Sequence, residues 1–173
     1  MTTITARPLP DESLLLNYQR NGAFADCYAA DIARTVTHAQ FVEAFYTTKV
    51  FAVEQFLLGL FLSKPSNDSQ ARQLALGSID SFAAWKVEAR AKNQILLTDF
   101  TGRTHSWLMV APQERGAATM TRLCFGSAVR AVTDRKTGVK SMGLAFHALL
   151  GFHKLYSRTL LSRATAKLRS AAR

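Results

Sequence analysis

The sequence predicts an α+β domain in which a curved antiparallel sheet wraps around one long C-terminal helix. Two observations carry this prediction. From about residue 80 the apolar residues alternate, and four alternating segments follow one another with only short turns between them. The chain then closes with a long segment of helical periodicity, residues 144–169.

The first half of the chain predicts one strand and several helices. Residues 24–32 favour a strand, and the apolar period becomes helical from residue 37 onward. Thr37 and Gln40 have the spacing of a capping box. The β-branched residues at 47–50 indicate a break into two helices. A loop and a short helix that stops at Gly77 come next.

The second half predicts a meander of four strands, whose register follows from its turns. A two-residue turn at Thr101–Gly102 pairs Thr98 with His105 and Leu96 with Trp107. Asp99, beside this turn, is expected to stabilise it. The four strands cover residues 81–90, 94–100, 103–112 and 119–129.

One face of this meander combines aromatic residues with two basic side chains. With a second two-residue turn at Lys92–Asn93, the alternation gathers six residues on it: Trp85, Phe100, Arg103, His105, Trp107 and Met109. The opposite face, with residues such as Lys86, Glu88 and Ser106, is more polar, although an apolar strip of Ile95, Leu97 and Leu108 also lies there and would pack on helices or on a second subunit. We therefore expect the aromatic face to be concave and to meet the terminal helix.

The terminal helix has one broad apolar face, and His153 lies near its middle with Tyr156 at its flank. His147 falls on the opposite side, so the two histidines cannot bind one metal ion from a straight helix. No phosphate-binding glycine loop, nucleophile elbow or zinc spacing occurs elsewhere. The sequence thus predicts no metal site, no cofactor and no identifiable catalytic set.

Length and composition predict a single domain with short extensions. At 173 residues the chain is long enough for one core; we expect an extended arm over 1–22, the domain over 23–165 and a basic tail over 166–173. The apolar run at 50–62 is too short to cross a bilayer. Cys27 and Cys124 match no redox or metal spacing, which favours reduced, buried thiols in a cytoplasmic protein.

Nearly all of the net charge of +10 belongs to the last quarter of the chain. Residues 130–173 hold ten basic side chains and a single acid, Asp134. The basic side of the terminal helix is either a solvated face or a contact for an anionic membrane surface. Nucleic acid fits less well, because the aromatic residues do not interleave with the basic ones. The basic residues concerned are Lys154, Arg158, Arg163, Lys167 and Arg169.

Several segments also resemble a family of uncharacterised bacterial proteins in the START-like (SRPBCC) superfamily, which has the helix-grip fold. The most recognisable are "GRTHSWLMV", "TRLCFGSAV" and "GFHKLYS". The resemblance covers roughly residues 20–165 and implies a helix-grip fold that binds an apolar ligand between sheet and helix. It implies no catalytic set, so the expected function follows from the fold alone.

These observations predict a protein that binds a small apolar or amphipathic ligand. The expected contacts are Trp85, Phe100, Arg103, His105, Trp107, Met109, His153 and Tyr156. A cyclase or dehydratase on the same scaffold is the alternative, with His105 or His153 transferring a proton. For both histidines the alternative is a structural role, as a hydrogen-bonded core imidazole.

Overall fold

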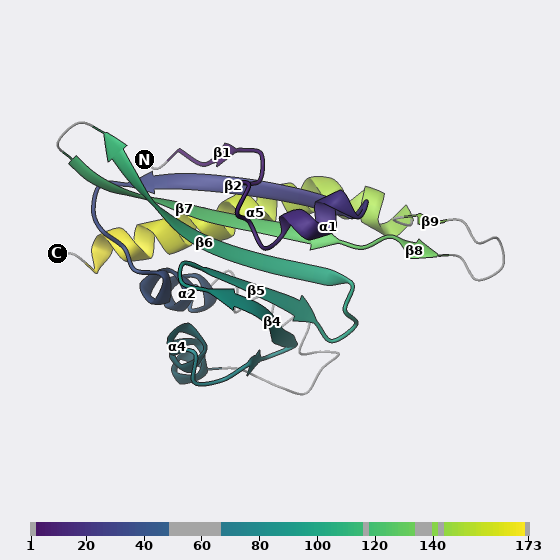
Figure 1. The fold of residues 1–173 in the computed structure, drawn as a ribbon, viewed down its shortest axis with the longest axis horizontal. Helices are drawn as coiled ribbons and strands as arrows, with labels where there is room; N and C mark the ends of the chain where they lie inside the picture. Colours follow the sequence, from purple (N-terminus) through teal and green to yellow (C-terminus); the bar gives the residue numbers. More distant parts are fainter. Residues whose placement is uncertain (1–2, 49–66, 116–117, 134–139, 142–143, 172–173) are drawn as a thin grey trace.

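A seven-stranded antiparallel sheet with a long C-terminal helix packed against it forms the protein (Figure 1). The computed structural model describes residues 3–48, 67–115, 118–133, 140–141 and 144–171. It describes the side chains of all these residues except 114–118 and 132–150. Within these ranges the arrangement is helix-grip-like, as predicted from the order of the elements.

The strand order in the sheet is β1-β2-β7-β6-β5-β4-β3, so the meander β4 to β7 is extended by the first two strands of the chain. The strands are β1 (Thr5–Ala6), β2 (Phe24–Ile32), β3 (Ser81–Phe82), β4 (Trp85–Ala91), β5 (Gln94–Asp99), β6 (Thr104–Arg115) and β7 (Ala118–Val129). Strands β8 (Val132–Thr133) and β9 (Lys140–Ser141) form a separate pair.

The helices are α1 (Leu16–Arg20), α2 (His38–Tyr46), α4 (Asp68–Leu76) and α5 (Leu144–Ser170). The start of α2 and the end of α4 lie where the local sequence predicts, whereas α1 lies within the segment predicted to be an extended arm. Thr37 and Gln40 form the predicted capping box at the start of α2. Gly77 ends α4 in the left-handed conformation, at φ 78°. The predicted helix break at 47–50 and the apolar run at 50–62 fall largely or wholly outside the described residues.

The predicted hairpin register is confirmed: Thr98 pairs with His105 and Leu96 with Trp107. Asp99 accepts hydrogen bonds from the Thr101 amide, the Thr101 hydroxyl and the Arg103 amide at 2.7–3.1 Å, which confirms its role in the turn. Burial alone would raise the pKa of Asp99, but hydrogen bonds from Thr101, Arg103 and Thr104 outweigh it and lower that pKa.

Both faces of the sheet are buried, each by a different part of the chain. The inner face carries β2, β5, β6 and β7 side chains such as Tyr28, Leu97, Leu108 and Phe125, which join one core with α2, α4 and α5. From α5 this core receives Leu160, Leu161, Ala164 and Leu168. The predicted apolar stripe of the terminal helix therefore packs on the sheet, and α5 continues through the segment assigned above to the tail.

The outer face is covered by the N-terminal segment after β1, through Leu9, Leu14, Leu15 and Tyr18, which crosses it in front of the sheet while α5 runs behind (Figure 1). Leu15 is fully buried there against Trp107, Met109 and Cys124. A Cβ at Gly126 would lie 2.6 Å from the Asp26 carbonyl oxygen and 3.0 Å from the Trp107 ring. Glycine at this position lets the Trp107 ring lie directly on the backbone of β7.

Cys27 and Cys124 are buried free thiols on this outer face, as predicted. No helix among the described residues has the length and hydropathy needed to cross a membrane.

Candidate functional site

Three polar side chains from three different elements meet on the inner face, which is mostly apolar. Asp26 lies on β2, Ser127 is its cross-strand partner on β7, and His153 reaches them from α5. Ser127 Oγ is 2.7 Å from Asp26 Oδ1 and 2.7 Å from His153 Nε2. We call these three residues the inner polar cluster.

The hydrogen bonds of the cluster define the roles of its atoms. An ionised carboxylate can only accept, so the Ser127 hydroxyl donates to Asp26 Oδ1. Ser127 Oγ then accepts from His153, which requires the proton of a neutral ring to lie on Nε2. In this tautomer Nδ1 has a free lone pair and is the basic atom of the ring.

One carboxylate oxygen of the cluster has no good hydrogen-bond donor. Asp26 Oδ2 is buried without a well-formed hydrogen bond, although His153 Nε2 lies 3.3 Å away. The neighbouring Tyr28 is buried; burial first, then the Asp26 charge, and to a smaller extent a hydrogen bond to Asp26 raise the pKa of its phenol. A buried carboxylate oxygen in this state would gain from a further donor.

A second polar pair extends this line across the sheet. Ser106 on β6 is the cross-strand partner of Ser127, and its hydroxyl lies 3.2 Å from the Tyr46 hydroxyl of α2. Ser127, Ser106 and Tyr46 are all buried, with 3–6% of each residue exposed. Polar groups therefore form a row over β2, β7 and β6, with α5 at one end and α2 at the other.

The cluster is not sealed. The His153 side chain is 27% exposed and that of Asp26 12% exposed, and the Phe24 ring packs edge-on to the imidazole at 6.4 Å between centroids. The prediction that His153 projects toward the sheet is confirmed, although its partners are side chains rather than a backbone group or Tyr156.

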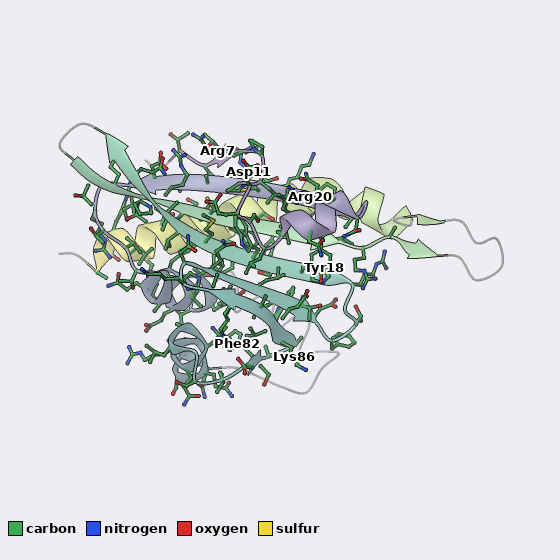
Figure 2. All side chains as sticks on the ribbon, in the orientation of Figure 1. Arg7, Asp11, Tyr18, Arg20, Phe82 and Lys86 are labelled. Carbon is green, nitrogen blue, oxygen red and sulfur yellow. The ribbon has the colours of Figure 1, made fainter. Side chains whose placement is uncertain are left out.

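The other histidine predicted to contact a ligand is enclosed on the outer face. His105 is 1% exposed, stacks on Tyr18 with 3.8 Å between ring centroids, and has Nε2 3.3 Å from Glu88 Oε2. Tyr18 reaches the sheet from α1 and also donates a hydrogen bond to Glu88 (Figure 2). Burial lowers the pKa of His105, and the nearby Glu88 carboxylate only partly offsets this effect.

The expectation that the aromatic face meets the terminal helix is wrong for its central residues. His105, Trp107 and Met109 lie on the outer face, beneath the N-terminal segment, while α5 packs on Leu108 and its neighbours. Trp107 is fully buried and donates from Nε1 to Gln94 Oε1 at 2.8 Å. The cause is that both faces of the sheet are apolar, so alternation alone does not distinguish them.

Trp85 differs from these residues because of a β-bulge. The β4–β5 register follows the prediction from Ala91 to Ala89 and then shifts between Ala89 and Val87. The extra residue turns Val87 and Trp85 to the inner face, where both pack against the inner core. The prediction that Trp85 shares a face with Trp107 is therefore also wrong.

The other predicted contacts lie in two places. Phe100 is 71% exposed in the β5–β6 turn, and Arg103 beside it donates to the Arg130 carbonyl oxygen at 3.3 Å. Tyr156 is half-buried against the inner core. Of the eight predicted residues, the structure thus brings only Trp85, His153 and Tyr156 to the inner side.

Sequence reasoning missed Asp26 and Ser127. A signal was present, because Asp26 is an acid within the largely apolar strand 24–32, where a buried charge requires a partner. Identifying that partner requires the pairing of β2 with β7, which joins residues about a hundred positions apart.

A cavity of about 310 Å³ opens elsewhere, between α2, α4 and the end of α5. It contains none of the predicted ligand contacts. Its cations are already engaged, since Arg72 pairs with Glu43 at 3.1 Å and Lys167 donates to Thr47. The residues that line it are Glu43, Thr47, Asp68, Ser69, Arg72 and Lys167.

No protein-family model matches the chain, and no curated protein matches it. Among solved structures the chain is similar to the crystal structure of CalU16 from Micromonospora echinospora, with 11% sequence identity, 99% of this chain and 95% of that chain covered, and a TM-score of 0.26. So distant a likeness carries no argument about function.

Proposed function

We propose that this protein is a START-like, helix-grip ligand-binding protein that holds a small amphipathic molecule between the inner face of the sheet and α5. One observation carries the proposal: Asp26, Ser127 and His153 converge from β2, β7 and α5 on an apolar surface. Apolar walls with a few convergent polar groups are typical of small-molecule sites.

The chemistry of the cluster favours a ligand whose polar end donates a hydrogen bond. Asp26 Oδ2 and His153 Nδ1 are acceptors, and the first is buried without a well-formed bond. A hydroxyl, phenol or amine would satisfy such acceptors, and a site built for a donor rejects an analogue that lacks it. Trp85 and Tyr156, at the edge of the inner core, would contact the apolar body.

A matched pair of probes tests this proposal. 2-Naphthol carries an apolar body and one hydroxyl donor, whereas 2-methoxynaphthalene has the same ring system without the donor. Isothermal titration should give saturable binding of 2-naphthol and at least tenfold weaker binding of the ether, a difference of about 1.4 kcal/mol. Equal affinity for the two probes, or no binding of either, would contradict the proposal.

Two variants complete the test. Ser127→Ala removes the hydroxyl that orients His153 and should weaken binding of 2-naphthol but not of the ether. Ser162→Ala removes a half-exposed hydroxyl from the outward side of α5 and should change neither. Equal loss in both variants would mean that the inner polar cluster does not hold the polar end.

A second function, proton transfer, is favoured by the tautomer of His153. With Nε2–H held by Ser127 and Asp26, Nδ1 would accept a proton from a substrate carbon, and the Asp26 carboxylate would stabilise the imidazolium. This is the chemistry of a cyclase or dehydratase. 2-Tetralone provides a simple assay, because its C1 protons are acidic and belong to an apolar molecule. NMR in D₂O measures the rate at which these protons exchange for deuterium.

In that assay the base takes a proton from C1, leaving an enolate, and a deuteron from solvent replaces it. The wild-type protein should accelerate the exchange, and His153→Gln should return it to the buffer rate. Acceleration that survives His153→Gln would reject the role of this residue, and no acceleration by the wild type would leave binding as the function.

A further inference from the structure

The outward side of α5 exposes two large apolar residues next to each other. Phe152 is 65% exposed and Leu155 is 66% exposed, and three-residue spacing places them on the same side of the helix. The Phe152 ring also stacks on Tyr156, with 6.1 Å between centroids. Single exposed apolar residues are common on protein surfaces, but here two occur together on successive turns.

The same side of α5 is strongly cationic. Arg163 and Arg169 are exposed on this side, and Lys154 is exposed at its flank, about 100° around the helix from Leu155. No acidic residue occurs anywhere in the sequence of α5. Among the described residues, no ion pair joins a lysine or arginine of α5 to a carboxylate. Arg158 and Lys167 are less available, because they donate to the Ile4 carbonyl oxygen and to Thr47.

This surface does not compete with packing of the core. Leu160, Leu161, Ala164 and Leu168 face the sheet, whereas Phe152 and Leu155 face away from it. A membrane contact through the apolar stripe of α5 would require that stripe to leave the sheet. The structure separates the two, so the helix can meet a partner without unfolding.

We propose that the outward side of α5 docks on an anionic lipid bilayer, with Phe152 and Leu155 entering the headgroup boundary and Lys154, Arg163 and Arg169 contacting lipid phosphates. A bilayer fits better than a nucleic acid because the surface combines an aliphatic side chain with cations that have no carboxylate partner among the described residues. Leucine gains free energy by entering the acyl boundary but offers no stacking surface to a base. This proposal is independent of ligand binding on the inner face.

Vesicle co-sedimentation tests the proposal with the whole chain. The protein should bind 100 nm vesicles of phosphatidylcholine and phosphatidylserine at a ratio of about 7:3, bind pure phosphatidylcholine at least tenfold more weakly, and lose binding as salt rises. The triple variant Lys154→Gln/Arg163→Gln/Arg169→Gln should lose the preference for phosphatidylserine. Each cation is expected to contribute about fivefold.

The apolar anchors are tested by Phe152→Ser/Leu155→Ser, which should weaken binding to anionic vesicles several-fold at constant charge. Two control variants come from other parts of the surface. Leu76→Ser/Phe100→Ser removes two other exposed apolar residues, 68% and 71% exposed. Arg20→Gln/Lys86→Gln/Lys92→Gln removes three exposed cations, two of them labelled in Figure 2. Both controls should bind vesicles as the wild type does.

Three results would overturn the proposal. Equal loss in the α5 and control variants would show a nonspecific effect of charge or hydrophobicity. No binding to anionic vesicles at low salt would exclude the bilayer. The third result is that the wild type binds a 20-nucleotide poly(U) RNA but no vesicles, and that the triple variant loses this RNA binding. That result would assign the cations to nucleic acid.

Discussion

The two faces of the sheet each hold a histidine beside a carboxylate, but the two histidines have different surroundings. On the outer face His105 is 1% exposed and lies beneath Tyr18 of the N-terminal segment. On the inner face the His153 side chain is 27% exposed and is oriented by the Ser127 hydroxyl. A histidine–carboxylate pair alone therefore does not identify a ligand-binding site. The two histidines differ in solvent access and in whether a hydroxyl fixes the tautomer of the ring.

The outer face is closed by hydrogen bonds as well as by apolar packing. Gln94 accepts from the Leu14 amide at 3.0 Å and from Trp107 Nε1 at 2.8 Å, and it donates to the Glu12 carbonyl oxygen at 2.9 Å. One buried side chain thereby joins the N-terminal segment to β5 and β6. We infer that this face is structural and that the inner face carries function.

The largest expected effect is on the outer face. Trp107→Ala removes a fully buried ring and leaves Gln94 without its indole donor, so the free energy of unfolding should fall by about 3–5 kcal/mol. Urea denaturation measures this directly. Phe100→Ala, at a residue 71% exposed, should change stability by less than about 0.5 kcal/mol. Similar losses in the two variants would contradict the assignment of Trp107 to the core.

A smaller loss is expected from Gly126→Ala. The new Cβ would lie 2.6 Å from the Asp26 carbonyl oxygen, so the β2 or β7 backbone must shift. Overpacking of this kind typically costs about 1–3 kcal/mol. Thermal unfolding by calorimetry would measure the loss, and an unchanged melting temperature would show that the outer face is less tightly packed than described.

The pH dependence of stability provides a third test. The pKa of His105 is lowered in the folded protein. In the unfolded chain the same side chain has the ordinary histidine pKa of about 6.5. In mild acid the unfolded state therefore binds more protons than the folded state. The free energy of unfolding should therefore fall as the pH drops below about 6.5, at no more than about 1.4 kcal/mol per pH unit for one proton.

His105→Gln should flatten that fall without removing it. The remainder would come from His38, because burial lowers the pKa of His38 to about 4. Glu88, Asp99, Tyr18 and Arg130 surround His105 and remain in the variant. Denaturation curves at pH 7, 6 and 5 measure the slope, and an unchanged slope would show that the pKa of His105 is the same in the folded and the unfolded chain.

The smallest effect on stability belongs to the inner polar cluster. Ser127→Ala removes one hydroxyl that bridges Asp26 and His153 and should cost about 1 kcal/mol. The same variant is expected to affect ligand binding far more than stability. A loss as large as that of Trp107→Ala would instead mean that the cluster is a structural element of the core.

Sequence predicted the local features of the fold and the orientation of α5. The Thr37 cap, the Gly77 stop, the Thr101–Gly102 turn and the sheet-facing side of His153 all depend on residues near one another in the chain. Each is specified by short-range geometry, so a single sequence contains enough information to place it.

What sequence did not predict depends on distant contacts. The N-terminal segment was expected to be a peripheral arm, yet Leu15 is fully buried on the sheet. Because this segment packs on the outer face, both faces of the sheet carry apolar side chains. For this reason the prediction assigned the central aromatic residues to the wrong face. The bulge in β4 and the approach of Asp26 to Ser127 likewise depend on strand pairing that alternation cannot reveal.

The central claim is that the inner face binds a ligand while the outer face does not. Long-range ¹H–¹⁵N NMR of the imidazole rings, recorded as 2-naphthol is added, compares the two histidines in one sample. His153 should show an Nε2–H ring whose signals move in proportion to bound probe, whereas those of His105 should not move. Signals of His105 that follow the titration while those of His153 stay fixed would contradict the account.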